Sequence, residues 1–186
     1  MDKFDIDNVL QIVELSNELE FEKANALQLK LRWMIKEDES LRPIREHLRF
    51  LIRNFENKYW SYIDTITDEQ INSNSKAELL VSAENNFIFE RKELIKLKLK
   101  AYGLLQTDLA KILGHRDNYM SELINGVRPF SKDDIIIIHR ILKIKLDSLI
   151  SPFVKEDVAR HVRTTLQTLN KPKVKLSKKD FNFAQI

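Results

Sequence analysis

The chain has 186 residues, of which 43% are hydrophobic and 32% are charged. This balance is typical of a folded globular protein rather than of a disordered one. There is no Cys, which excludes disulfides, thiolate metal sites and cysteine nucleophiles. Only three Gly and four Pro are present, so tight hairpins and Gly-rich phosphate loops have little raw material, and we expect an all-α protein.

Charge is distributed unevenly along the chain. Residues 1–85 carry 11 Lys and Arg against 17 Asp and Glu, a net charge of −6, whereas residues 86–150 carry +4 and residues 151–186 carry +5. A basic surface suits a phosphate backbone, although charge alone fits an ordinary solvated surface equally well. No apolar run approaches a membrane span, and Asp2 and Asp5 disagree with a basic signal peptide, so we expect a cytoplasmic protein without membrane contact.

The N-terminal part is predicted to be a helical domain over residues 1–64. Apolar residues recurring at spacings near three and four predict one amphipathic helix over residues 4–19 and a second over 21–36. Ser40 is expected to cap a third helix, which has Pro43 in its first turn and an apolar stripe that reaches Trp60.

Residues 65–85 are rich in Asn, Ser, Asp and Glu, which predicts a linker, partly helical, between two domains. Residues 86–151 then form the second domain, and residues 152–186 form a C-terminal helix and basic tail. The apolar pattern predicts that the helix covers Val154 to Leu169. Alternating Phe181 and Phe183 suggest a docking strand, against the default of an unstructured terminus.

The informative segment runs from residue 103 to residue 126. Ala110 is small where a second helix must cross closely, and Gly114 permits a left-handed turn between two helices. Asn125 and Gly126 are suited to terminating the second helix. The residues expected to face inward and fix the angle are Leu109, Leu113, Met120 and Leu123.

This arrangement resembles the helix-turn-helix of the Xre/Cro/C1 repressor superfamily, in which a Gln-x-x-Leu-Ala-x-x-Leu-Gly helix precedes a recognition helix ending in Asn-Gly. The resemblance covers residues 87–150 and implies a five-helix lambda-repressor-like domain. Residues 126–131 resemble the Gly-x-Arg-Pro-hydrophobic-Ser junction of HigA-type antitoxins. Ser131 and Asp134 should cap the next helix, which contains Ile135 to Ile138, and Leu146 to Ile150 should form a short fifth helix.

By position, the resemblance implies the DNA contacts. The residues implied to read bases are Asp117, Asn118, Tyr119 and Glu122, and those implied to contact phosphates are Gln106, Arg116, Asn125 and Arg128. Asn118 can bond adenine at two points, whereas an acid accepts only from cytosine. Asp117 equally fits a first-turn carboxylate and Glu122 a solvated side chain. The sequence departs from the family in these two acids and in Leu105, where a Ser or Thr cap is usual.

Residues 37–59 resemble the N-terminal helical region of HigA-type antitoxins, which bind a RelE-like ribonuclease toxin and repress their own operon, usually as dimers. A segment of charge −6 suits such a basic toxin. The alternatives are a stand-alone or phage-type repressor with a helical dimerisation domain, and a protein-interaction adaptor that has lost DNA binding. The four His are widely spaced and form no metal-ligand or nucleophile pattern, so we expect no cofactor, no metal and no enzymatic activity.

Overall fold

The computed structural model describes residues 3–62, 64, 66–154, 156–169, 171, 173 and 174. Regular structure within these residues is entirely helical, which confirms the all-α class. The α-helices are α1 (Glu18–Met34), α2 (Arg42–Tyr59), α3 (Asp68–Ala101), α4 (Gln106–Leu113), α5 (Asp117–Ile124), α6 (Lys132–Leu142) and α7 (Glu156–Leu169). Short 3-10 turns cover Val9–Gln11, Glu39–Leu41 and Leu146–Ser148.

The prediction of one helix over residues 4–19 is wrong. This segment is irregular apart from the 3-10 turn at Val9–Gln11, and α1 starts at Glu18, where Asn17 accepts a hydrogen bond from the backbone N–H of Glu20. The buried residues fall at every third position: Ile6, Val9, Ile12 and Leu15. A strict period of three suits 3-10 and extended backbone rather than the 3.6-residue α-helix. It leaves Val13 87% exposed.

The helices α1 and α2 pack together, and the irregular N-terminal segment completes their core. Pro43 lies in the first turn of α2, as predicted, but Asp38 rather than Ser40 caps the turn that precedes it. The rings of Phe21 and Phe55 stack with centroids 4.9 Å apart. The buried residues of this first core are Ile6, Val9, Ile12, Leu15, Ala24, Leu27, Leu31, Met34, Leu41, Leu48, Leu51, Ile52, Phe55 and Val127.

Most of the predicted linker belongs to α3, a single helix of 34 residues. Thr67 caps it by accepting a hydrogen bond from the N–H of Gln70, and Asp68 and Glu69 complement the helix dipole in its first turn. Ala77 and Val81 are buried on this half of α3, which packs against α1. The cap and this packing outweigh the weak helix propensity of the Asn and Ser residues.

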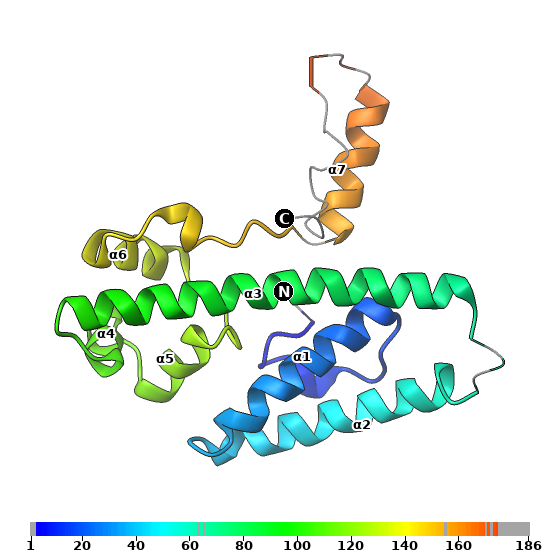
Figure 1. Ribbon diagram of the computed structural model, residues 1–186, viewed down its shortest axis with the longest axis horizontal. Coiled ribbons are helices and arrows are strands. Elements are labelled where there is room, and N and C mark those ends of the chain that lie inside the picture. The colour runs from blue at the N-terminus through cyan, green and yellow to red at the C-terminus, as the bar shows by residue number, and fades with distance from the viewer. Residues whose placement is uncertain are drawn as a thin grey trace.

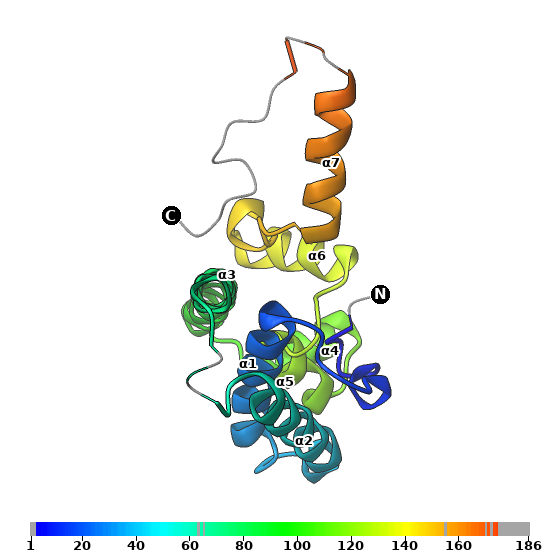
Figure 2. The same cartoon turned by 90° about the vertical axis from the view of Figure 1, so that its right-hand side faces the viewer.

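The second half of α3 forms another core with α4, α5 and α6. Its buried residues are Ile95, Leu99, Leu109, Ala110, Met120, Leu123, Ile124, Phe130, Ile138, Leu142, Ile144 and Leu149. Ser131 and Asp134 form the predicted reciprocal cap of α6, so the four successive isoleucines are helical. Viewed along either direction, α3 joins the two halves, with α1, α2 and α5 on one side and α6 on the other (Figures 1 and 2).

The C-terminal helix α7 confirms the helical pattern predicted after residue 154 and projects away from the rest of the chain (Figures 1 and 2). The residues proposed for a docking strand, Phe181 and Phe183, lie outside the described residues, as does most of the basic tail. Within the part of the chain that the structure describes, no helix is long and apolar enough to cross a membrane.

Candidate nucleic-acid interface

A tight left-handed turn joins α4 to α5. Gly114 has φ +73°, and the N–H of His115 donates to the carbonyl of Ala110 at 2.9 Å, which closes the end of α4. Ala110, Met120 and Leu123 are fully buried beneath the turn. His115 also bonds Asp134 across to α6 at 3.0 Å. These contacts fix the angle at which α5 is presented.

The start of α4 lacks a side-chain cap, as the Leu residue at position 105 predicts. Asp108 compensates by accepting a hydrogen bond from the N–H of Leu105 at 2.9 Å. Gln106 is half-buried at the first helical position. The resemblance to the Xre/Cro/C1 superfamily implies that Gln106 contacts the DNA backbone.

Asn125 and Gly126 end α5, as predicted. The Asn125 amide donates to the Ser121 carbonyl at 2.8 Å and its oxygen accepts from Nζ of Lys92 at 2.7 Å, which ties α5 to α3. Gly126 has φ +66° and lies against Ile88, so a Cβ there would come within 2.6 Å of the Ile88 side chain. Gly126 therefore both ends α5 and allows close packing against Ile88 of α3.

The four predicted base-reading residues divide into two groups. Asp117, Asn118 and Tyr119 are exposed together at the start of α5, beside exposed Arg116. Glu122 is buried to 8% exposure in the last half of the helix. Its carboxylate accepts a hydrogen bond from Nε of Arg128. The structure thus brings three of the four to the surface as one group.

Arg128, predicted to contact phosphate, is engaged by acids of the N-terminal half. Besides Glu122, it bonds Asp7 through both terminal nitrogens, one of them at 2.8 Å, and its Nη1 lies 3.9 Å from Asp5. The hydrogen bond from Arg128 lowers the pKa of Asp7, and the same contact raises the pKa of Arg128. The guanidinium lies over the Tyr119 ring, 5.2 Å from its centroid.

A second contact joins the two halves at α5 itself. The Asn118 amide donates to Oδ2 of Asp38 at 3.1 Å, beside the turn between α1 and α2. Hydrogen bonds from Ser40, and from Asn118, lower the pKa of Asp38. We call Asp5, Asp7 and Asp38 together the acidic contact. Sequence reasoning did not identify these residues, and the only signal for them was the opposite charge of the two halves.

A first helix packed on the core through Leu109 and Ala110, a glycine turn and a second helix with an exposed N-terminal face define a helix-turn-helix domain. Residues 95–149 match the family model described as Helix-turn-helix, of the Xre/Cro/C1 type, and this match supports a role in DNA binding and transcription regulation. No curated protein and no solved structure matches the chain. Among the described residues, no group of three or more His, Cys, Asp and Glu is placed to hold a metal ion.

Proposed function

We propose that the chain is a sequence-specific repressor that inserts the start of α5 into the major groove of duplex DNA. The observation that supports it best is the exposed group Asp117, Asn118 and Tyr119 on a helix held rigidly by the Gly114 turn. Asn118 can form a two-point hydrogen bond with adenine. In this proposal Glu122 also contacts a base, once Arg128 turns to a phosphate and no longer donates to the Glu122 carboxylate.

Phosphate contacts complete the proposed interface. Gln106 is the first residue of α4, Arg116 is exposed just before α5, and Asn125 follows the last residue of α5. Arg128 becomes available once Asp7 is displaced. In this proposal the acidic contact holds positions that DNA takes over, because a phosphate offers Arg128 the same charge-assisted bonds as a carboxylate.

The salt dependence of DNA binding tests this function. The two cationic phosphate contacts, Arg116 and Arg128, predict that the logarithm of affinity falls with the logarithm of salt concentration with a slope of about −2 for each bound chain. The DNA to use is the region upstream of the chain's own gene, with random duplex of the same length beside it. A flat response on both would instead favour the alternative function, a protein-interaction adaptor without a DNA role.

An antitoxin of the HigA type is the second candidate for the biological role. It rests on the resemblance of residues 37–59 and on the excess of acidic residues in the N-terminal half, which suits a small basic RelE-like toxin. Co-expression with the protein encoded by the adjacent gene is the test. Co-purification and relief of toxicity support the antitoxin role, whereas a harmless neighbour that does not bind leaves the stand-alone or phage-type repressor.

Both repressor roles are expected to involve a homodimer, because paired half-sites in DNA are read by paired domains. A fragment cut at residue 85 would divide α3, so the full chain is the better sample. Light scattering at several concentrations, with and without DNA, then gives the oligomeric state. A mass of 22.0 kDa for the free chain, together with a complex that holds one chain per duplex, would contradict a dimer.

A further inference from the structure

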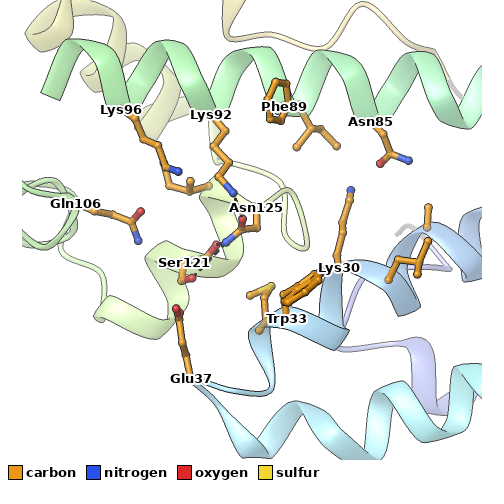
Figure 3. A pocket seen from close by; sticks show the side chains of 15 residues that line it. Lys30, Trp33, Glu37, Asn85, Phe89, Lys92, Lys96, Gln106, Ser121 and Asn125 are labelled. Atoms are coloured by element: carbon orange, nitrogen blue, oxygen red, sulfur yellow. Dashed lines mark hydrogen bonds between the residues drawn. The ribbon is translucent and has the colours of Figure 1, made fainter. Parts of the chain in front are cut away.

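A cavity of about 610 Å³ lies where the two halves meet, bordered by α1, α3 and the end of α5 (Figure 3). Its volume falls in the range of about 300–1,000 Å³ typical of small-molecule sites. Among its lining residues the proposed repressor function uses only Gln106 and Asn125. Seven of the fifteen lining residues are apolar and eight are polar or charged, so the space offers both apolar contacts and hydrogen-bonding groups.

Three lysines converge on the cavity. Lys30 comes from α1, and Lys92 and Lys96 come from α3 (Figure 3). Glu37 is the one acid among the residues that line it. Lys92 bonds Asn125 at 2.7 Å and Lys96 lies 3.5 Å from Glu93. The Lys30 amine has no hydrogen-bond or ion-pair partner among the described residues, so its charge is balanced by no direct contact.

Burial lowers the pKa of Lys30 to about 8, and Arg91 on α3 acts in the same direction while Glu84 on α3 opposes it. The charge of Glu84 therefore offsets only part of the cost of holding this amine charged. A bound anion would offset more of it, because an opposite charge within a few ångströms favours the protonated form.

Two exposed aromatic rings line the same cavity. Trp33 of α1 is 64% exposed and Phe89 of α3 is 62% exposed, which is unusual for such large apolar side chains. They come from the two helices on either side of the space (Figure 3). Neither ring belongs to either hydrophobic core. A planar ligand inserted here would bury both rings, and stacked aromatic rings attract each other beyond the gain from burying their area.

We propose that this cavity binds a small planar organic anion of nucleoside monophosphate size, with its anionic group on Lys30 and Lys92 and its ring between Trp33 and Phe89. The ligand contacts α1 and the α5 end together, so it stabilises the arrangement in which the acidic contact is made. Gln106 and Asn125, both proposed as phosphate contacts, also line the cavity. This second step rests on the proposed function: the ligand lowers affinity for DNA by reciprocal linkage.

Direct binding tests the site without DNA. Adenosine 5′-monophosphate is titrated into the full chain by calorimetry, and into a Trp60→Phe variant in which Trp33 is the remaining tryptophan and is excited selectively. Saturable binding with a change in Trp33 emission is expected. Lys30→Met should weaken it at least tenfold, whereas Lys76→Met, which removes an exposed lysine elsewhere on α3, should leave it unchanged. Equal loss in both variants, or no binding by the wild type, overturns the proposal.

Two ligands that each carry one part of the monophosphate distinguish the contribution of the anionic group from that of the ring. Adenosine and inorganic phosphate should each bind at least tenfold more weakly than the monophosphate. If phosphate alone matches it, the aromatic contacts are wrong, and if adenosine alone matches it, the lysine contacts are wrong. Either result overturns the proposed ligand class.

A final arm measures DNA affinity with and without the monophosphate. The ligand should weaken DNA binding by the wild type about fivefold or more and leave Lys30→Met unaffected. Ligand binding with no effect on DNA affinity overturns the coupling alone. A chain that binds the monophosphate but no DNA overturns the repressor function, while the calorimetric result for the site still stands.

Discussion

The side-chain amide of Asn118 donates a 3.1 Å hydrogen bond to the carboxylate of Asp38, a residue eighty positions earlier in the chain. One partner lies at the start of α5 and the other just before α2. The amide that is proposed to read a base is therefore already occupied by a carboxylate of the same chain. DNA and the N-terminal half compete for it.

Neutralising the acidic contact should strengthen DNA binding. In the double variant Asp7→Asn and Asp38→Asn, we expect about fivefold tighter binding, because each exposed charged contact contributes only about 0.5–1 kcal/mol. Fluorescence anisotropy with labelled duplex at fixed salt gives the affinity. The charge-matched control is Glu46→Gln with Glu56→Gln, which removes two exposed acids of α2. An equal gain in this control would mean that net charge, rather than the contact, sets the affinity.

Asn118→Ala should reduce discrimination between operator and random DNA by on the order of 1–3 kcal/mol. The substitution also removes the hydrogen bond to Asp38. Loss of this bond should strengthen binding to both DNAs equally, so the ratio of the two affinities is the informative quantity. The comparison variant is Gln106→Ala, expected to weaken both DNAs equally because a phosphate contact carries no sequence information. An unchanged ratio in Asn118→Ala would remove Asn118 from the base-reading group.

Two glycines with the same backbone conformation should differ in their tolerance of alanine. Gly114 and Gly126 have φ of +73° and +66°, and a left-handed alanine costs about 1–2 kcal/mol at either. A Cβ at Gly114 meets nothing within 4 Å, whereas at Gly126 it meets Ile88 at 2.6 Å. Urea unfolding should show a further loss of about 1–3 kcal/mol for Gly126→Ala. In an Ile88→Ala background that further loss should disappear, and its persistence would contradict the clash.

Lys30→Met should stabilise the fold at pH 7, by on the order of 1–3 kcal/mol. The pKa of Lys30 is lowered from 10.5 to about 8 in the folded chain, so below pH 8 the wild type bears the full cost of a charged amine. Between about pH 8 and 10.5 the unfolded chain binds more protons than the folded one, so wild-type stability rises with pH. The advantage of the variant should therefore shrink from pH 7 to pH 10. Denaturant unfolding at pH 7, 8.5 and 10 measures it, and a constant difference would contradict the shift.

Local chemistry was sufficient to predict the helix-turn-helix region. Gly114 has the left-handed conformation expected of it, Asn125 and Gly126 end α5 as expected, and Ser131 with Asp134 forms the expected cap. Each of these features depends on residues within four positions of one another. The cap also explains why four successive isoleucines are helical, although their composition alone favours a strand.

Long-range packing determines the structure of the segments that the hydrophobic pattern predicted wrongly. Residues 4–19 have apolar spacings close to those of an α-helix, but Ile12 and Leu15 are buried by contact with α1 and α2 in a period-three backbone. The polar run in α3 is typical of a linker, and packing on α1 makes it helical. The contact of Arg128 with Asp7 spans 121 positions. No periodicity encodes such a contact, and only the opposite charges of the two halves agree with it.

The continuous helix α3 limits how the chain can release its DNA-reading face. At 1.5 Å per residue its 34 residues form a strut about 50 Å long, shared by both hydrophobic cores. Because α3 is one continuous helix and not a flexible linker, it restricts how the N-terminal half, with its acidic residues, can move relative to α5. Moving α1 and α2 as a body away from α5 requires either bending α3 or separating α1 from Ala77 and Val81. The stiffness of α3 therefore contributes to the free energy that DNA binding must supply to separate the two halves.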